Sequence, residues 1–246
     1  MADLVFLHGA GDSAAVWELQ VEHFRRHHRV LALDLPGHGA RLGELAYHTV
    51  GQNAEEAVRA IKLRGFRRPV LVGHSMGGAT ALAITLGWPE LPRALVLVAS
   101  GARLRMRPEL LEEARRRAEA APPGQPIERA IPLDAVVWSG ASEEVQSWLR
   151  ARFGRSSGQA TYADFLATHN FDVMARLPEV RAPTLVVGGE EDLWTPPRFQ
   201  HYLAQHISHA RLALLAHTGH YPFVEQAPAF NAELERFLGD LEETAE

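Results

Sequence analysis

The chain has 246 residues, of which 46% are hydrophobic, and its 25 lysines and arginines against 30 aspartates and glutamates leave a formal net charge of −5. This composition indicates a globular chain, most simply a single domain with a large core. The mild acidity, without a basic patch that includes aromatic residues, argues against nucleic acid as a partner, and the absence of cysteine excludes disulfides, thiolate metal sites and cysteine nucleophiles.

The first strand is expected at Asp3–Leu7, so close to Met1 that no room remains for a signal peptide. No segment of the sequence has the length and apolar character of a transmembrane helix. We therefore expect no membrane partner and, by default, a cytoplasmic location.

A glycine-rich turn, His8-Gly9-Ala10-Gly11, follows the first strand and precedes an amphipathic helix with Trp17, Val21 and Phe24 on one face. Such a turn exposes backbone N–H groups that can stabilise an oxyanion. A phosphate loop is the alternative, but neither Gly-Lys-Ser/Thr nor G-x-G-x-x-G occurs here. His8 is expected to be structural, hydrogen-bonded within the turn.

The second strand is expected at Val30–Leu33, closed by the turn residues Asp34 to Gly39. A helix follows whose apolar side chains fall on one stripe: Ala54, Ala57, Val58 and Ile61. Further on, Val70 to Val72 indicates a buried strand and Ala79 to Leu86 a helix.

Between that strand and that helix lies Gly73-His74-Ser75-Met76-Gly77. Gly-x-Ser-x-Gly in this context is typical of a nucleophile elbow, in which small flanking residues allow a strained turn that exposes the serine hydroxyl. The alternative interpretation is a serine that caps the helix.

A fourth strand is expected at Ala94–Val98, followed by Ser100. The alternation of strands and helices predicts a three-layer α/β fold with a mostly or wholly parallel sheet of about six strands. Ligands of such sheets bind beyond the carboxyl ends of the strands. His8, Ser75 and Ser100 are all placed at that edge.

From residue 103 to 177 the pattern becomes helical, with helices expected at Pro108–Ala121, Ser142–Phe153 and Tyr162–His169. We expect this segment to be a helical cap on a core formed by residues 1–102 and 178–246. A separate helical domain is the alternative, disfavoured because the apolar stripes are narrow and the segment is short. Several aromatic side chains would line a pocket under the cap or belong to ordinary core: Trp138, Trp148, Phe153, Phe165 and Phe171.

Two strands, Thr184–Val187 and Arg211–Leu215, flank a helix at Arg198–Ile207 and complete the sheet. A final helix packs on it through Phe230, Leu234, Phe237, Leu238 and Leu241. The first of these strands leads into an acidic loop with Glu190, Glu191 and Asp192, followed by Trp194, another candidate pocket residue. The second leads to His217 and His220.

A serine hydroxyl needs an adjacent base, and that base needs a third group to hold its tautomer. The order serine, acid, histidine matches the α/β-hydrolase arrangement. Spacing does not separate the three candidate acids, nor His217 from His220. A histidine pair for a metal lacks a third ligand at suitable spacing, so we expect no metal and no cofactor.

Five motifs in order carry a resemblance: Leu7 to Gly11, Asp34 to Gly39, Gly73 to Gly78, Gly189 to Asp192 with Pro196, and Gly219-His220. From Leu4 to the last helix the chain resembles an α/β-hydrolase-fold serine hydrolase of the esterase and lipase-like group. The resemblance implies Ser75 as nucleophile, Asp192 as acid and His220 as base. It also implies that the N–H groups of Ala10 and Met76 form the oxyanion hole.

The chain departs from this family at its start, because it lacks the β-hairpin that usually precedes the first motif. Val30–Leu33 would then be an edge strand, and such strands are normally covered or blunted. This suggests self-association as a homodimer through that edge. Glu191, next to Asp192, remains an alternative acid.

The expected function is therefore hydrolysis of a small, ester-like molecule through an acyl-enzyme on Ser75. Its substrate pocket is expected to include Trp138, Phe165 and Trp194. The same triad would also suit a C–C bond hydrolase, an enol-lactonase, a thioesterase or a lyase. A non-catalytic, receptor-like binding protein is the alternative of another class, whereas Ser75 at the elbow disfavours an aspartate-nucleophile dehalogenase.

Overall fold

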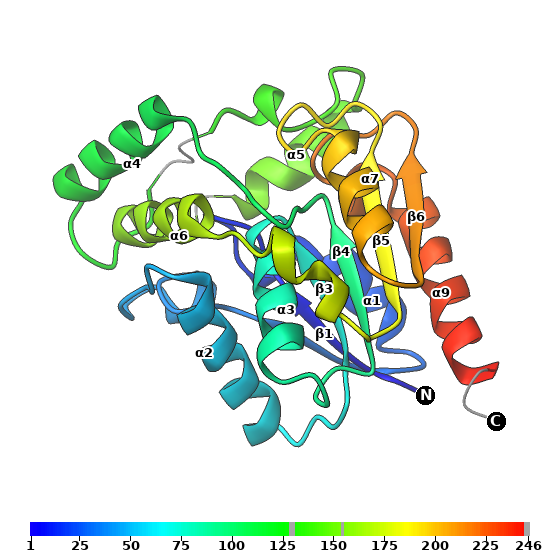
Figure 1. Ribbon diagram of the computed structural model, residues 1–246. Helices are drawn as coiled ribbons and strands as arrows, with labels where there is room; N and C mark the ends of the chain where they lie inside the picture. Colours follow the sequence, from blue (N-terminus) through cyan, green and yellow to red (C-terminus); the bar gives the residue numbers. More distant parts are fainter. Residues whose placement is uncertain (128–130, 154, 244–246) are drawn as a thin grey trace.

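The computed structural model describes residues 1–127, 131–153 and 155–243, and in it a parallel six-stranded sheet lies between two layers of helices (Figure 1). The strand order is β2-β1-β3-β4-β5-β6, and every neighbouring pair is parallel. This confirms the α/β fold predicted from the sequence. The strands are β1 (Asp3–Leu7), β2 (Arg29–Leu33), β3 (Val70–His74), β4 (Ala94–Val98), β5 (Thr184–Gly189) and β6 (Ala210–Leu215).

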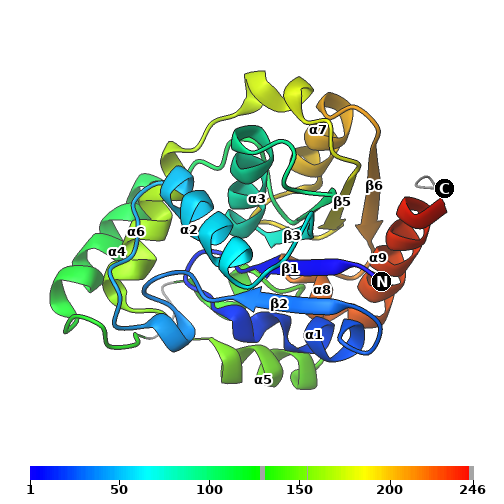
Figure 2. The same cartoon turned by 90° about the horizontal axis from the view of Figure 1, so that it is seen from below.

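Helices cover both faces of the sheet because its central strands are apolar on both faces. Figure 2 shows α1 (Glu18–Phe24), α8 (Pro222–Glu225) and α9 (Ala227–Glu243) on one side, and α2 (Val50–Leu63), α3 (Met76–Gly87) and α7 (Pro197–His206) on the other. Two buried apolar clusters result, one on each face. Among the described helices, none is long and apolar enough to cross a membrane. The expected cytoplasmic location stays a prediction.

Strand β2 lies at one edge of the sheet, as predicted, since it pairs with β1 alone in the described part of the chain. Val30, Leu31 and Ala32 are half-buried against the two cores, so their side chains are partly covered by the chain itself. The outer edge of β2 has no strand beside it, and self-association there stays a prediction.

The segment between β4 and β5 contains the helices α4 (Pro108–Ala120), α5 (Glu143–Arg152) and α6 (Gly158–Asn170), and we call it the insertion. Helices α4 and α6 lie side by side (Figure 1). Phe165 and Leu149 of the insertion share one buried cluster with Phe6 of β1, which argues against a separate core. Residues 128–130 and 154 of the predicted cap and 244–246 of the predicted core lie outside the described residues.

Candidate active site

The turn between β3 and α3 forces Ser75 into a backbone conformation with φ 51° and ψ −115°, which a residue with a side chain rarely adopts. Glycines on both sides make this turn possible. A Cβ at Gly73 would lie 2.2 Å from the carbonyl oxygen of Gly77, and one at Gly77 would lie 2.2 Å from the carbonyl oxygen of Leu7. Only glycine allows α3 to approach β1 and β3 this closely.

The backbone of Ser75 is held firmly, whereas its hydroxyl makes no capping bond. Its N–H donates to the carbonyl of Val98 at 2.9 Å, and its carbonyl accepts from Ser100 Oγ at 2.7 Å and from the N–H of Gly78 at 2.9 Å. Although Ser75 is the N-cap residue of α3, its side chain forms no hydrogen bond to the helix. The helix-cap interpretation therefore does not describe this serine.

His220 and Asp192 form a buried pair, with Nδ1 donating to Oδ2 at 2.9 Å. Thr195 Oγ1 donates to the same oxygen at 2.7 Å, and the N–H groups of Trp194 and Thr195 donate to Oδ1 at 2.7 and 2.8 Å. Burial alone would raise the pKa of Asp192, but the His220 charge and these hydrogen bonds outweigh it and hold the pKa below its ordinary value. Asp192 is thus kept as a carboxylate that orients the imidazole.

The competing acids and histidine of the sequence lie elsewhere. Glu190 is exposed, and Glu191 Oε2 accepts the N–H of Thr218 at 3.0 Å. The His217 side chain is 67% exposed and lies 3.9 Å from Glu191 Oε1. The structure therefore brings His220 together with Asp192, and no competing residue takes either place.

A half-buried carboxylate that was not predicted from the sequence, Glu225, shapes the histidine loop. It accepts the N–H groups of Trp138, Gly219 and Tyr221 at 2.8 to 2.9 Å. Its pKa is raised because burial outweighs these three hydrogen bonds. An acid that directly follows the apolar run from Tyr221 to Val224 is the signal that would have indicated it. Glu225 ties the loop that carries His220 to the insertion.

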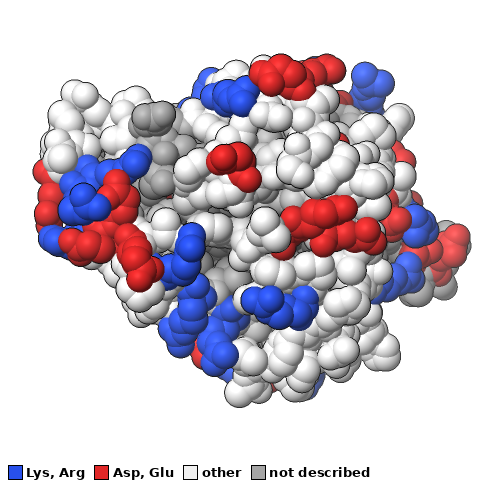
Figure 3. Space-filling model, turned by 90° about the horizontal axis from the view of Figure 1, so that it is seen from above, with Lys and Arg blue, Asp and Glu red and all other residues white. Residues whose placement is uncertain are grey.

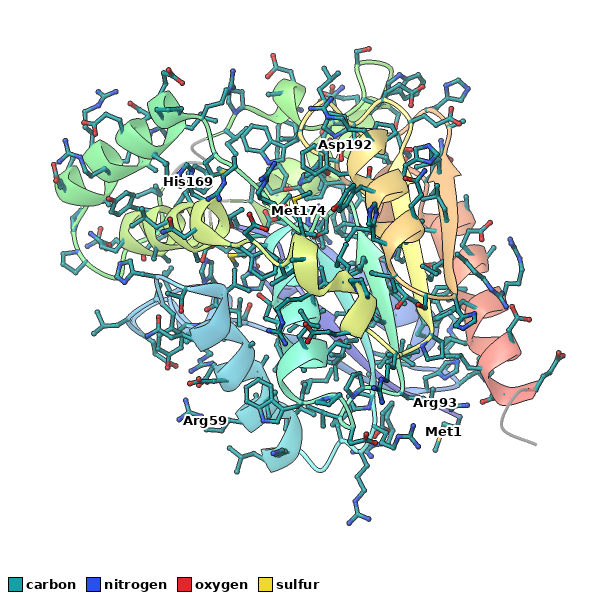
Figure 4. All side chains as sticks on the ribbon, in the orientation of Figure 1. Met1, Arg59, Arg93, His169, Met174 and Asp192 are labelled. Carbon is teal, nitrogen blue, oxygen red and sulfur yellow. The ribbon has the colours of Figure 1, made fainter. Side chains whose placement is uncertain are left out.

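Two cavities that share lining residues lie at the carboxyl ends of the strands, the side on which Figure 4 places Asp192. The inner cavity, of about 20 Å³, is lined by Ser75, His220, Ala10, Phe165 and Trp194 among others. The outer cavity, of about 500 Å³, shares Ser75 and Trp194 with it and opens toward α4 and α7. Ser75 and His220, which come from distant parts of the sequence, thus face the same space.

The expected pocket residues divide between two places. Phe165 and Trp194 line the inner cavity. Trp138 is not among the described residues that line either cavity, and its ring instead lies 4.9 Å from the ring of His217. The N–H of Trp138 donates to Glu225, which holds this half-buried residue beside the histidine loop.

The loop after β1 carries Ala10 and is fixed by histidines. His8 donates from Nδ1 to the carbonyl of Gly9 at 2.8 Å and accepts the N–H of Leu35 at Nε2 at 3.1 Å. Both ring nitrogens are therefore occupied, as expected for a structural residue. Burial, with the nearby charge of His38, lowers the pKa of His8, so this ring stays neutral.

A second buried histidine–aspartate pair, unforeseen in the sequence, holds the same loop from the other side. His38 Nε2 donates to Asp164 Oδ2 at 2.9 Å, and that oxygen also accepts the N–H of Gly11 at 2.8 Å. Burial alone would lower the pKa of His38, but the charge and hydrogen bond of Asp164 and the carbonyls of Pro36 and Leu35 raise it overall. Asp164 belongs to α6, so the insertion anchors the glycine-rich loop.

Metal ligation has no evident place in the described residues, among which no group of three or more His, Cys, Asp or Glu side chains could hold a metal ion. The chemistry that these residues offer is that of a serine that lines a cavity, a buried imidazole and a buried carboxylate at one edge of the sheet.

Comparisons with known proteins agree with the fold. The model of the alpha/beta hydrolase family matches residues 4–233. A pimeloyl-[acyl-carrier protein] methyl ester esterase from Nitrosomonas europaea is 33% identical over 234 residues, which cover 90% of each chain.

Solved structures show the same fold. The enol-lactonase from Burkholderia xenovorans LB400 superposes with a TM-score of 0.83 and 25% identity, over 97% of this chain and 91% of that one. A thermophilic esterase from Thermogutta terrifontis with bound malate superposes with a TM-score of 0.85 and 24% identity, over 98% and 90% of the two chains. The chain belongs to the alpha/beta hydrolase family and is an esterase-like hydrolase.

Proposed function

We propose that the protein hydrolyses carboxylic esters of small molecules through an acyl-enzyme on Ser75, with His220 as base and Asp192 as the acid that orients it. The observation that carries this proposal is the His220–Asp192 hydrogen bond of 2.9 Å, made by a histidine that lines the same cavity as the elbow serine. Because Nδ1 is held by Asp192, Nε2 is the nitrogen left for the serine proton.

In the first half of the reaction, His220 Nε2 takes the proton of Ser75 as Oγ attacks the ester carbonyl carbon. The tetrahedral intermediate collapses, the C–O bond to the leaving alcohol breaks, and the imidazolium returns the proton to that alcohol. In the second half, His220 takes a proton from a water that attacks the acyl carbon, the bond from that carbon to Ser75 Oγ breaks, and the imidazolium returns the proton to Oγ as the acid is released. Asp192 stabilises the imidazolium in both halves.

The oxyanion would be held by the N–H groups of Ala10 and Met76. Met76 is the first residue of α3, so its N–H has no acceptor within the helix, and Ala10 lines the inner cavity. Each such donor contributes about 3 kcal/mol of transition-state stabilisation. The anchoring of the neighbouring Gly11 by Asp164 would keep the Ala10 N–H in place.

The insertion would act as the cap over a core of residues 1–102 and 178–246, and it would set which acyl groups fit. Phe165 and Met106 from the insertion line the inner cavity beside Ser75, which supports this role. Enol-lactone hydrolysis is a second candidate, favoured by the likeness to the Burkholderia xenovorans enzyme, and it would use the same three residues. A panel of esters, thioesters and lactones separates these reactions.

The direct test is turnover of a short p-nitrophenyl ester by the wild-type chain and by Ser75→Ala. We expect Ser75→Ala to lose about 10⁴-fold or more of kcat/KM, with an unchanged circular dichroism spectrum. Ser139→Ala, at an exposed serine of the insertion, is the matched control and should keep wild-type turnover. Wild-type turnover by Ser75→Ala would overturn the proposal, and so would a wild-type chain that turns over no ester, thioester or lactone.

A further inference from the structure

The outer cavity has an arginine-rich mouth that ester hydrolysis alone does not require. We propose that Arg105, Arg107 and Arg198 bind an anionic group of the substrate, a carboxylate or a phosphate, at the end remote from the scissile ester. This inference rests on the proposed function of Ser75 and specifies its substrate class.

The sequence places three arginines on one side of an extended segment after β4. Ala102, Leu104 and Met106 are buried, while Arg103, Arg105 and Arg107 between them are exposed. This alternation is that of extended backbone, in which successive side chains point to opposite sides. The apolar side chains anchor the segment, and the guanidinium groups gather on its other side.

A fourth arginine completes the cluster from the opposite wall. Arg198 lies in the first turn of α7, and with Arg105 and Arg107 it lines the same outer cavity as Ser75. Arg103, Arg105 and Arg198 also line an adjoining hollow of about 510 Å³. Arg105 donates to the carbonyl of His169, the α6 residue labelled in Figure 4. This bond fixes the Arg105 side chain against α6.

Acidic partners near these arginines are few. Asp172 lies 3.8 Å from Arg103 and 3.7 Å from Arg105, beyond hydrogen-bond length. Within the described part of the chain, no carboxylate lies within 4.0 Å of a guanidinium nitrogen of Arg107 or Arg198. Asp172 therefore offsets part of the charge of Arg103 and Arg105, whereas Arg107 and Arg198 have no carboxylate partner among the described residues.

The rest of the surface shows that this excess is local. The whole chain carries a net charge of −5. On α4, arginines have glutamate partners within one turn, as Arg115 has in Glu112 and Arg116 in Glu113. Figure 3 shows both patterns on one face, with mixed charges at one end of the molecule and basic side chains gathered beside a hollow.

A guanidinium binds carboxylate and phosphate oxygens through paired N–H donors, which suits either anion. Leu104, Met106, Leu110 and Phe199 line the cavity that also contains Ser75 and the arginines. An ester with an apolar chain that ends in an anion would fit this cavity, with its carbonyl at Ser75, its chain against the apolar side chains and its anion at the arginines. A cavity of about 500 Å³ is within the size range of small-molecule sites.

The test compares esters that differ only at the remote end: methyl hexanoate, monomethyl adipate, and the methyl ester of 6-phosphonooxyhexanoic acid. We expect the wild-type chain to favour the two anionic esters in kcat/KM. In the double variant R107Q/R198Q, the ratio of anionic to neutral kcat/KM should fall about tenfold or more, mainly through KM. The carboxylate and phosphate arms identify which anion is preferred.

Arg116→Gln is the matched control, since it removes the same charge from an exposed arginine of α4 and should leave the ratio unchanged. Equal ratios in the wild-type chain and the double variant would overturn the inference while neutral ester turnover still supported the proposed function. If no ester is turned over, calorimetric binding of monomethyl adipate to Ser75→Ala still decides. Loss of that binding in the added R107Q/R198Q background supports the arginine site, and no binding to Ser75→Ala overturns it.

Discussion

Among the described residues, two buried histidine–aspartate pairs have the same N–O separation of 2.9 Å, and they differ in the partner of the other imidazole nitrogen. His220 gives Nδ1 to Asp192, and no described residue hydrogen-bonds its Nε2. His38 gives Nε2 to Asp164 and Nδ1 to the carbonyl of Pro36, at 3.0 Å. A base needs one nitrogen available, whereas a structural imidazole is satisfied at both.

The two pairs also differ in what they connect. Asp192 and His220 come from the loops after β5 and β6 and meet at the cavity of Ser75. His38 and Asp164 join the loop after β2 to α6 of the insertion, with Gly11 as a third contact. Burial and pairing with an aspartate therefore do not by themselves identify a catalytic base. A base also needs a second ring nitrogen that faces the substrate cavity and is not hydrogen-bonded within the protein.

The largest expected effect separates the pairs by the same substitution. His220→Gln should lower kcat by about 10⁴-fold or more, because no other group takes the Ser75 proton. His38→Gln should instead lower the free energy of unfolding by about 3 kcal/mol or more, because Asp164 loses its charged partner while buried. Ester turnover and urea unfolding of both variants measure the two effects. A stable His38→Gln protein with as little activity as His220→Gln would break the distinction.

A smaller effect is expected at Thr195, whose hydroxyl donates to Asp192 Oδ2 at 2.7 Å. Thr195→Val removes this donor from a buried carboxylate and should lower kcat/KM about tenfold, consistent with the loss of one hydrogen bond to a charged group. Thr195→Ser retains the hydroxyl and is the matched control. If Val and Ser variants are equally active, the hydroxyl does not help to hold the carboxylate in place.

The smallest effect is a pH dependence of stability that belongs to His38. Its pKa in the folded chain is raised, so the folded state holds this proton more tightly than the unfolded state. The stabilisation is full below the ordinary pKa of about 6.5 and is lost as pH rises through the raised value, at up to about 1.4 kcal/mol per pH unit. Urea unfolding across this range should show a decline that His38→Gln lacks. Parallel curves for the two chains would contradict the assignment.

Most of the fold was predictable from the sequence because local patterns determine it. The apolar runs Val70 to Val72 and Ala94 to Val98 fall on β3 and β4, and the alternation with helices implies the parallel sheet. The starts of two helices, α3 and α6, differ from the predicted ones, and in both helices glycine occurs in the first turn. The apolar pattern predicts a helix from Ala79, but α3 begins at Met76 and includes Gly78. Glycine is needed at position 78 for close packing, because a Cβ there would lie 2.5 Å from Ser100 Oγ.

The start of α6 shows the same limitation. The sequence predicts a helix from Tyr162, whereas α6 begins at Gly158, because the Ser157 hydroxyl accepts the N–H of Ala160 at 3.1 Å and caps the helix. Ser157 is the N-cap signal in the sequence. It is easily overlooked, because the residue after it is glycine, which is a poor helix former.

The candidate site was predictable only in part. Gly-x-Ser-x-Gly marks Ser75 locally, but the selection of Asp192 and His220 over their neighbours depended on resemblance. The contact of His38 with Asp164 spans 126 positions, and that of Gly11 with Asp164 spans 153, so no local pattern indicates either. The arginine cluster was visible as an alternating run from Arg103 to Arg107, yet its position at the cavity depends on α7, far along the chain.

The most direct measurement is mass spectrometry of the chain quenched within its first turnover of p-nitrophenyl acetate, followed by peptide mapping. The account predicts one added acetyl group on Ser75 in the wild-type chain and none in Ser75→Ala, with formation strongly slowed in His220→Gln and not in His38→Gln. Ester turnover with an acetyl group on another residue, or with no covalent intermediate when Ser75 is replaced, would contradict the central claim.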